Sequence, residues 1–218
     1  MPKELAIVLS NGSINSAVVA ALAAQKYRPV MVHVDAYGTA TRARRAYDQQ
    51  VGHFKPYREH TVALPLLTTL AQAHPRTPMV DPRVVPEVTP KLVALLPVVG
   101  LAMSLAVHYS AQAVYLGLRV GTDGDELARA TEWNQVWNEL LQLACGLSSI
   151  ELMLPLLELD PWQVVDLGVQ VSAPLDMTWS CDELDAPEPC GRCAGCLARD
   201  AAFLRAAKPD PLRAGSRR

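Results

Sequence analysis

The stretch LAIVLSNGSINS, residues 5–16, decides the fold prediction because it runs from a strand pattern into a loop of small residues. Leu5–Leu9 is a continuous apolar run, which is typical of a strand buried on both faces of a parallel sheet. An Ala-rich helix is predicted next, from Ala17 to Gln25. The chain therefore opens with a strand, a loop and a helix.

The same alternation continues along the chain. Apolar runs predict further strands at residues 30–34, 59–64, 113–118 and 150–154. Helices are predicted at residues 39–54, 91–111, 131–145 and 161–167, the last with Asp160 as N-cap, Pro161 at N1 and Gly168 at C′. Residues 74–90 are rich in proline and predict a loop. Strands that alternate with helices predict an α/β fold with a doubly wound parallel sheet.

Composition narrows the class of protein. Of the 218 residues, 50% are apolar and 19% are charged, so a sizeable core is expected. The net charge of −2 gives no electrostatic footprint for nucleic acid or for an anionic membrane. No signal-peptide pattern is visible, and Pro97, His108 and Gln112 interrupt the longest apolar stretch. We therefore expect a cytoplasmic protein without direct nucleic-acid or membrane partners.

Four cysteines crowd into the last part of the chain, at Cys181, Cys190, Cys193 and Cys196, with the spacing C-x8-C-x2-C-x2-C. Four thiolates suit Zn²⁺, which takes soft ligands in a tetrahedron. Two disulfides or reduced buried thiols are the alternatives, and the intracellular character of the chain favours zinc. A closed four-cysteine site leaves no position for water, so one structural zinc ion per chain is predicted.

The loop at residues 10–16 follows a strand end, where ligands of such sheets bind. Gly12 permits a turn with positive φ, and the N–H groups of the loop and of the following helix can then hold an anion. Ser10, Ser13 and Ser16 add hydroxyl donors. The alternative interpretation is an ordinary turn with an N-cap.

Several segments together resemble the 7-cyano-7-deazaguanine synthase family of PP-loop ATP pyrophosphatases. PLDMTWSCDELDAPEPCGRCAGCLAR, residues 174–199, is similar to the zinc segment of the family, and PLLELDPWQVVDLGVQ, residues 155–170, to the part before it. LSNGSINSAVV, residues 9–19, stands where the family has Ser-Gly-Gly-x-Asp-Ser. DAYG, residues 35–38, resembles an Asp-Tyr-Gly segment that precedes a basic helix.

The resemblance implies a fold, an activity and a set of residues. Residues 1–173 would form the nucleotide-binding α/β domain, 174–207 the zinc lobe and 208–218 a flexible tail. The family converts 7-carboxy-7-deazaguanine and ammonia, with ATP and Mg²⁺, into 7-cyano-7-deazaguanine (preQ0) for queuosine biosynthesis; a homodimer is an open expectation. Candidate catalytic residues are Ser10, Ser16 and Lys91. The candidate ATP-binding residues are Leu9, Ser10, Asn11, Gly12, Ser13, Ile14, Asn15, Ser16, Ala17, Val18 and Val19.

The departures from the family pattern concentrate where ATP and the acceptor are expected. Asn11 replaces a Gly, and Asn15 replaces the Asp that is expected to help hold Mg²⁺. Lys91 stands in place of an Arg, and Pro161 in place of a Lys. The stretch ELARATEW, residues 126–133, is also altered. We therefore expect ATP–Mg²⁺ binding to be weakened or lost.

Three hypotheses about function follow: the family's enzyme, a non-catalytic zinc-stapled relative, and a PP-loop ligase for a different carboxylate.

Other residues have two interpretations each. Asp123, Asp125 and Glu126 are a solvated turn or contacts to metal or acceptor, and His33 is a core histidine or a catalytic one. Arg42 and Arg45 face phosphate or solvent, and Trp133 and Trp137 pack in the core or stack on a base. Cys145 is expected to be a buried free thiol.

Overall fold

The computed structural model describes residues 3–35, 41–64, 90–122, 124–145, 150–183 and 186–214. The predicted loop at residues 74–90 and Asp123 therefore lie outside the described residues, apart from the helical backbone at Pro90.

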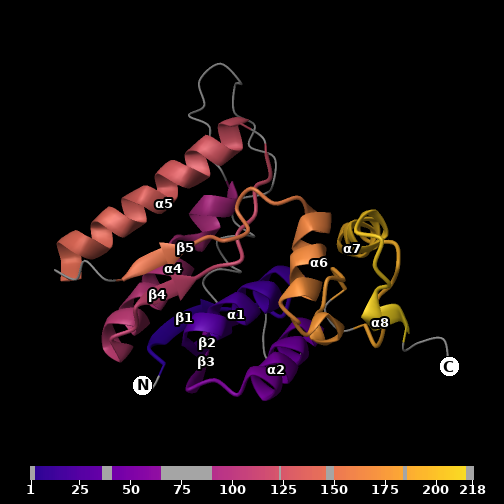
Figure 1. Ribbon diagram of the computed structural model, residues 1–218, viewed down its shortest axis with the longest axis horizontal. Coiled ribbons are helices and arrows are strands. Elements are labelled where there is room, and N and C mark those ends of the chain that lie inside the picture. The colour runs from indigo at the N-terminus through magenta and orange to yellow at the C-terminus, as the bar shows by residue number, and fades with distance from the viewer. Residues whose placement is uncertain are drawn as a thin grey trace.

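A parallel sheet of five strands forms the centre of the molecule, in the order β3-β2-β1-β4-β5 (Figure 1). Its strands are β1 (Leu5–Leu9), β2 (Arg28–Asp35), β3 (Arg58–Ala63), β4 (Ala113–Tyr115) and β5 (Glu151–Met153). All neighbours pair in parallel, with Leu9 opposite Val32 on one side of β1 and Val8 opposite Tyr115 on the other. The chain reverses its direction of travel across the sheet between β1 and β4, so the predicted doubly wound sheet is confirmed.

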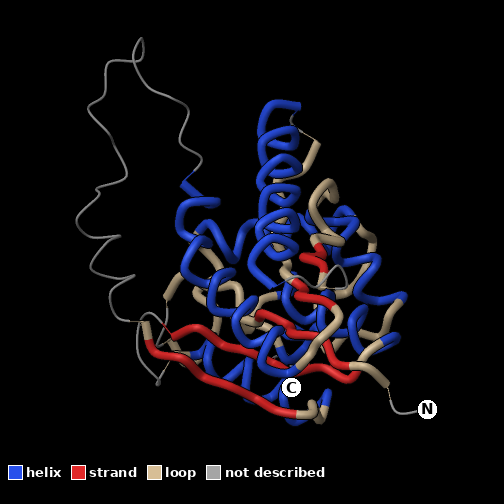
Figure 2. Tube along the Cα trace, turned by 90° about the vertical axis from the view of Figure 1, so that its left-hand side faces the viewer, coloured by secondary structure: helices blue, strands red, loops and turns tan. Residues whose placement is uncertain are grey.

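Helices cover both faces of this sheet, as Figures 1 and 2 show. Their bounds are α1 (Ile14–Lys26), α2 (Arg42–Phe54), α4 (Pro90–Tyr109), α5 (Gly124–Cys145), α6 (Pro161–Gln170), α7 (Ala194–Arg205) and α8 (Pro211–Ala214), with a 3₁₀ turn η1 at Leu175–Met177. Ile7 and Leu9 of β1 pack with residues of α4 and α5. Ala6 and Val8 point the other way and pack with α1 and α6, because successive side chains of a strand alternate between faces.

Local signals in the sequence account for several helix ends. Ser13 caps α1, since its side chain accepts from the Ser16 N–H, and Asp160 with Pro161 opens α6 as predicted. Gly168 does not end α6, which continues to Gln170. A Cβ at Gly168 would come within 2.9 Å of Val18. This glycine therefore permits close packing of α6 on α1 rather than a helix end.

Helix α4 corrects one expectation from the sequence. Its window Leu92–Tyr109 is long and apolar enough to cross a membrane, with a mean hydropathy of 2.0, because Pro97 is accommodated inside the helix. Only 28% of that window is buried. Val99, Ala102 and Ala106 nevertheless pack into the core against the sheet. Length and composition alone are weak support for a membrane span, and these contacts are those of a core helix.

The C-terminal part of the chain shares a core with the α/β part. Ala202 and Phe203 of α7 belong to the same buried cluster as Val18 of α1 and Val164 of α6. Helix α7 and Leu175 therefore pack directly on the helices that cover this face of the sheet.

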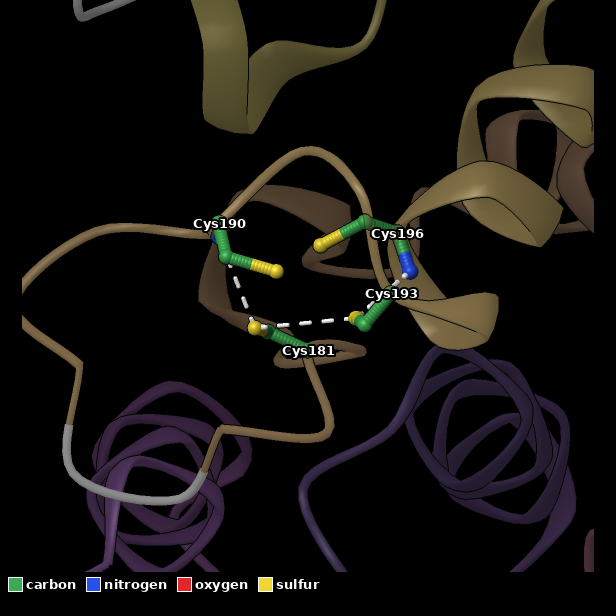
Figure 3. Close-up of side chains that lie close together, drawn as sticks. All are labelled: Cys181, Cys190, Cys193 and Cys196. Atoms are coloured by element: carbon green, nitrogen blue, oxygen red, sulfur yellow. Dashed lines mark hydrogen bonds between the residues drawn. The ribbon is translucent and has the colours of Figure 1, made fainter.

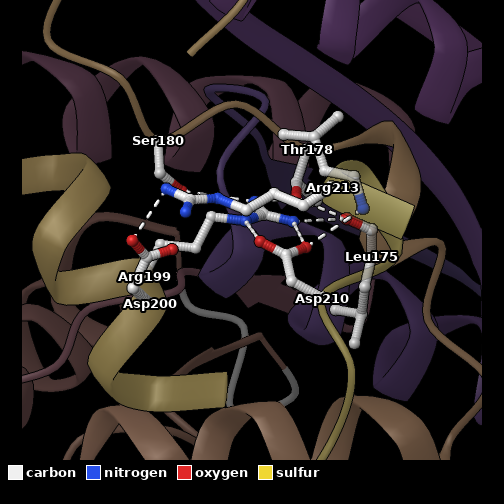
Figure 4. Close-up of polar contacts among 8 residues, drawn as sticks. Leu175, Thr178, Ser180, Arg199, Asp200, Asp210 and Arg213 are labelled. Atoms are coloured by element: carbon white, nitrogen blue, oxygen red, sulfur yellow. Dashed lines mark hydrogen bonds and ion pairs between the residues drawn. The ribbon is translucent and has the colours of Figure 1, made fainter. Parts of the chain in front are cut away.

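A buried arginine fixes the segment that leads into the cysteines (Figure 4). Arg199 binds both carboxylate oxygens of Asp210, with Nε–Oδ2 at 2.7 Å and Nη2–Oδ1 at 2.8 Å. Its remaining donors reach Thr178 Oγ1 at 2.7 Å, the Leu175 carbonyl at 3.0 Å and Ser180 Oγ at 3.5 Å. The Arg199 and Asp210 side chains are only 3% and 8% exposed. The sequence analysis expected residues 208–218 to form a flexible tail. Asp210 is instead anchored by Arg199, and helix α8 follows it.

We predict that Asp210→Ala lowers the free energy of unfolding by about 3–5 kcal/mol, because it leaves the Arg199 guanidinium buried without its counter-charge. Asp200→Ala is the matched control. Its partner Arg213 is 43% exposed, so that pair should contribute less than about 1 kcal/mol. Urea unfolding of both variants measures the difference. Equal midpoints for the two variants would contradict the anchoring role of Asp210.

Candidate functional site

A cavity of about 290 Å³ lies at the carboxyl ends of β1 and β4, where the order of the strands reverses. Such switch points are where open α/β sheets bind ligands. The cavity is lined by the loop after β1, the ends of β2 and β4, and one face of α4: Leu9, Ser10, Asn11, Ser13, Asn15, Ser16, Val32, Val34, Leu95, Val98, Leu116 and Gly117. The loop predicted from the sequence therefore lines a cavity of the right kind.

Gly12 makes the turn at the centre of this loop. Its φ is +79°, as the sequence analysis predicted, and a Cβ there would collide with the Ala43 carbonyl oxygen at the start of α2. Both the backbone conformation and the close approach of α2 therefore require glycine. The turn places the loop directly against the first turn of α2.

Buried hydrogen bonds hold Ser10 on all sides. Its N–H donates to the Val32 carbonyl at 2.9 Å, and its Oγ donates to Oε1 of Gln50 at 3.0 Å. The Ser10 carbonyl lies 2.9 Å from Nδ1 of His33. Gln50 is fully buried, and Ser10 and Ser16 are each 4% exposed. The two serine hydroxyls predicted to be catalytic thus serve the internal bonding of the loop.

His33 is the core histidine of the two interpretations offered by the sequence. Burial lowers the pKa of His33, and its ring stacks on Tyr47 at 4.9 Å. The short contact to the Ser10 carbonyl requires a proton on Nδ1, because a carbonyl can only accept. The neutral imidazole, with its proton on Nδ1, therefore donates a hydrogen bond to the backbone of the loop.

Two asparagines form hydrogen bonds within the protein at the loop where phosphate and a metal ion are expected to bind. Asn11 Oδ1 accepts from the Ser13 N–H at 3.2 Å, so one loop donor is already occupied. Asn15 Nδ2 donates to the Gly117 carbonyl at 3.1 Å and ties the loop to the end of β4. The N–H groups of Ile14 and Asn15 lie in the first turn of α1, where the helix supplies no acceptor. Among the described residues that line this cavity, none is acidic.

The four cysteines form one cluster (Figure 3). Their sulfurs all lie within 4.8 Å of one another, and the Sγ atoms of Cys181 and Cys193 are 3.8 Å apart. A tetrahedron with metal–sulfur bonds of about 2.3 Å has sulfur–sulfur edges of about 3.8 Å. The arrangement therefore fits a metal ion bound by four thiolates. All four are free cysteines, not disulfides. The cluster could therefore hold a metal ion.

Backbone donors prepare part of this cluster for metal. The N–H groups of Asp182 and Cys196 donate to Cys193 and lower its pKa to about 7. Burial raises the pKa of Cys196 to about 12. A metal ion that binds here must therefore displace a proton from Cys196, as metal binding to thiols generally does. A Cβ at Gly195 would collide with the Ser180 carbonyl. This glycine therefore lets the first turn of α7 pack against the backbone next to Cys181.

The loop and the cysteine cluster are joined by one short segment. Trp179 N–H donates to the Gly12 carbonyl at 2.9 Å, and Gln50 Nε2 donates to the Met177 carbonyl at 3.0 Å. The segment then runs into Cys181, which is two residues beyond Trp179. Sequence reasoning missed Gln50 and Arg199, because a buried Gln or Arg in a helix has no local signature before its partners are known.

Other candidates from the sequence lie elsewhere or outside the described part. Lys91 is in the first turn of α4, but its side chain is outside the described residues, as is that of Cys145. Asp125 and Glu126 are in the first turn of α5, which begins earlier than predicted. Trp133 and Trp137 meet edge to face at 5.9 Å and pack against the core, which favours the packing interpretation.

Comparison with known proteins places this architecture in a family. A 7-cyano-7-deazaguanine synthase from Acidobacterium capsulatum is 29% identical over 223 residues, covering 96% of each chain. One from Leptospira biflexa is 30% identical over 118 residues, covering 51% of this chain and 48% of that protein. The solved NH3-dependent NAD synthetase from Campylobacter jejuni has a TM-score of 0.51 at 12% identity, covers all of this chain and 84% of its own, and shows likeness of fold alone.

The family described as "Queuosine biosynthesis protein QueC" matches residues 5–207, which includes the β1 loop, all five strands and the four cysteines. The chain therefore belongs to the QueC family of queuosine biosynthesis proteins.

Proposed function

We propose that this chain is an ATP-dependent carbon–nitrogen ligase that forms 7-cyano-7-deazaguanine from 7-carboxy-7-deazaguanine and ammonia. The observation that carries the proposal is the family match over residues 5–207, joined to a loop-lined cavity at the switch point of a PP-loop sheet. The relative of this name from Acidobacterium capsulatum, matched over 96% of both chains, supports the choice of substrate.

The proposed reaction uses ATP twice. The carboxylate of the acceptor attacks the α-phosphorus of ATP, which forms an acyl-adenylate and releases pyrophosphate. Ammonia replaces AMP and gives the amide. A second ATP adenylates the amide oxygen and releases a second pyrophosphate, and loss of AMP and of the two amide protons leaves the nitrile. Because phosphorus chemistry needs position and charge neutralisation above all, the protein acts by holding the two reactants in line.

In this chain the first turn of α1 supplies the anion donors. The N–H groups of Ile14 and Asn15 and the positive end of the α1 dipole would face the phosphates. Ser13 lines the cavity and offers its hydroxyl, while Ser10 and Ser16 hold the loop in shape. Residues 9–19 remain the proposed nucleotide site, with Lys91 as the proposed charge partner.

Magnesium would be held loosely. Asn15 brings no charge, and its amide is already bonded to Gly117. The phosphate oxygens of ATP and water would then supply most ligands of Mg²⁺, which normally keeps several waters. ATP–Mg²⁺ binding should accordingly be weak.

The cysteine cluster is proposed to hold one structural Zn²⁺. Its four sulfurs have the softness and the tetrahedral spacing that zinc prefers, and they leave no open position for water. Zinc would therefore stabilise the lobe and take no part in the chemistry. Residues 174–207 are proposed as that lobe, and a homodimer stays a prediction.

One set of observations favours a second candidate function, a non-catalytic relative that keeps the fold. Asn11 and Asn15 satisfy the loop internally, so the loop is stable without nucleotide. A ligase for a different carboxylate is the third candidate, since the loop and its cavity are retained.

The purified protein should release AMP and pyrophosphate and form 7-cyano-7-deazaguanine when given ATP–Mg²⁺, ammonia and 7-carboxy-7-deazaguanine. The rate should be low, because each lost polar contact of roughly 1–3 kcal/mol slows turnover about tenfold or more. Mass spectrometry of the product and restored queuosine in a strain without its own synthase are the measurements. Soluble, zinc-loaded protein that fails both would favour the non-catalytic or altered-substrate candidates.

Asn15→Asp should strengthen ATP–Mg²⁺ binding, because it returns a carboxylate to the loop. The same change removes the hydrogen bond to Gly117 and should lower stability by about 1 kcal/mol. Asn15→Ala is the control, since it loses that bond without adding charge. Calorimetric titration of the three proteins decides the point, and wild-type affinity equal to that of Asn15→Asp would mean that another acid serves the metal.

Freshly purified protein should carry about one Zn²⁺ per chain. Cys193→Ser should release the ion and destabilise the C-terminal part of the chain, because binding of structural zinc contributes on the order of 10 kcal/mol to folding in small domains. Cys145→Ser, outside the cluster, should keep the metal. Elemental analysis tests all three proteins, and metal-free wild-type protein would falsify the zinc assignment.

A further inference from the structure

Two neighbouring helices expose an apolar face on one side of the molecule. Helices α4 and α5 lie side by side (Figures 1 and 2), and a Cβ at Gly100 of α4 would lie 3.9 Å from the Trp137 ring of α5. Six of the ten large apolar side chains that are exposed in the described part of the chain belong to these two helices. They form what we call the α4–α5 face: Val93, Leu96, Val107, Val136, Leu140 and Leu143.

Helix α4 is far more apolar than its contacts with the sheet require. Residues 92–107 include no charged side chain, yet only 28% of the window Leu92–Tyr109 is buried. One side of the helix packs in the core, and the other side leaves Val93, Leu96 and Val107 exposed. A continuous apolar surface of this kind marks a contact site on a protein rather than an ordinary solvated face.

The exposed stripe of α5 has the spacing of a contact between helices. Val136, Leu140 and Leu143 follow Trp133 at intervals of three, four and three residues, which is the alternation of positions a and d in a heptad. Side chains at these intervals lie along one side of a helix. Leu143 is 85% exposed, so one copy of the chain leaves this stripe without a covering partner in the described structure.

We propose that the α4–α5 face binds the same face of a second copy of this chain and forms a twofold symmetric dimer. A twofold contact brings one surface patch against itself, so the patch must be complementary to itself. All six residues of the α4–α5 face are apolar and meet this condition without any pairing of opposite charges. The resulting contact is a layer of four helices, two from each copy.

The size of the face agrees with what a stable dimer needs. Helix α4 has 20 residues and α5 has 22, so each is about 30 Å long at a rise of about 1.5 Å per residue. Two helices packed roughly 8–10 Å apart present a width of about 20 Å and hence an area of about 600 Å² before side-chain relief is counted. Standard protein interfaces bury about 800 Å² on each partner.

The charges beside the face disfavour the other apolar partner, a lipid bilayer. Glu132 and Glu139 are exposed on α5, each one residue before a position of the stripe. Residues 92–107 contribute no lysine or arginine that could contact lipid head groups. Helices that lie on a membrane carry such cations next to their apolar side, and acidic groups are repelled by anionic lipid.

The dimer would also support the switch-point cavity. Leu95 and Val98, on the inner side of α4, line that cavity, while Val93 and Leu96 of the same turns belong to the α4–α5 face. A second copy would therefore cover the outer side of the helix that forms one cavity wall. Without it, this wall packs on one side only.

Analytical ultracentrifugation of the full-length, zinc-loaded protein tests the proposal. Wild type should be a dimer with a dissociation constant in the micromolar range or tighter, as interfaces of this size have. Leu143→Glu should weaken the dimer by about tenfold or more, since it replaces a buried leucine by a charge. Val136→Glu, two turns earlier in the stripe, should do the same. Leu204→Glu on α7 is the matched control, because Leu204 is 83% exposed and lies outside the face.

Hydrogen exchange gives a second readout. Amides of residues 92–98 and 133–143 should exchange more slowly when wild type is concentrated, and Leu143→Glu should remove this dependence. Wild type that stays monomeric at about 100 µM, roughly a hundredfold above the weak end of that range, would overturn the proposal. A dimer that Leu143→Glu weakens no more than Leu204→Glu would place the contact on another face. Monomeric wild type that sediments with phosphatidylcholine–phosphatidylglycerol vesicles would assign the face to a bilayer instead.

Discussion

The buried ion pair between Arg199 and Asp210 is the constraint on which the positions of the cysteine cluster and of the β1 loop depend. A guanidinium can enter a core only when every donor finds an acceptor, and here Asp210, Thr178, Ser180 and the Leu175 carbonyl supply them. The consequence is that the backbone from Leu175 to Cys181 has one place to lie. A lysine could not do the same, because a single ammonium lacks the planar fork that reaches a carboxylate and two further oxygens together.

The fixed segment serves two centres at once. On one side it presents Cys181 to the other three cysteines, and on the other its Trp179 N–H meets the Gly12 carbonyl of the loop. The loop itself is unusually self-sufficient, since Asn11 and Asn15 bond within the protein where a phosphate loop normally leaves donors and charge for its ligand. A loop whose hydrogen bonds are already satisfied without a ligand gains less free energy from binding nucleotide. The fold can therefore persist while ATP binding is weak.

Much of the fold could be predicted from the sequence, and the reason is local. Apolar runs such as Leu5–Leu9 and the cysteine spacing are short-range patterns, so the parallel sheet and the cluster followed from them. Features that depend on distant partners could not be read in this way. Gly168 resembles a helix end in sequence but is a packing contact with Val18, and Gln50 is polar in a helix yet fully buried by partners from two other elements. The role of Asn15 likewise depends on Gly117, which the chain reaches only after three more strands.

The bond from Gln50 to the Met177 carbonyl spans 127 residues of chain and sets an order of assembly during synthesis. Met177 is translated 127 residues after Gln50, so the carbonyl that completes this hydrogen bonding follows well after the loop itself. At roughly 5–20 residues per second, the nascent loop waits on the order of ten seconds for its final support. Because contacts so far apart also carry the largest loop-closure cost, the loop at residues 10–16 completes its native hydrogen bonding only after residues 177–179 have been made and have folded back onto it.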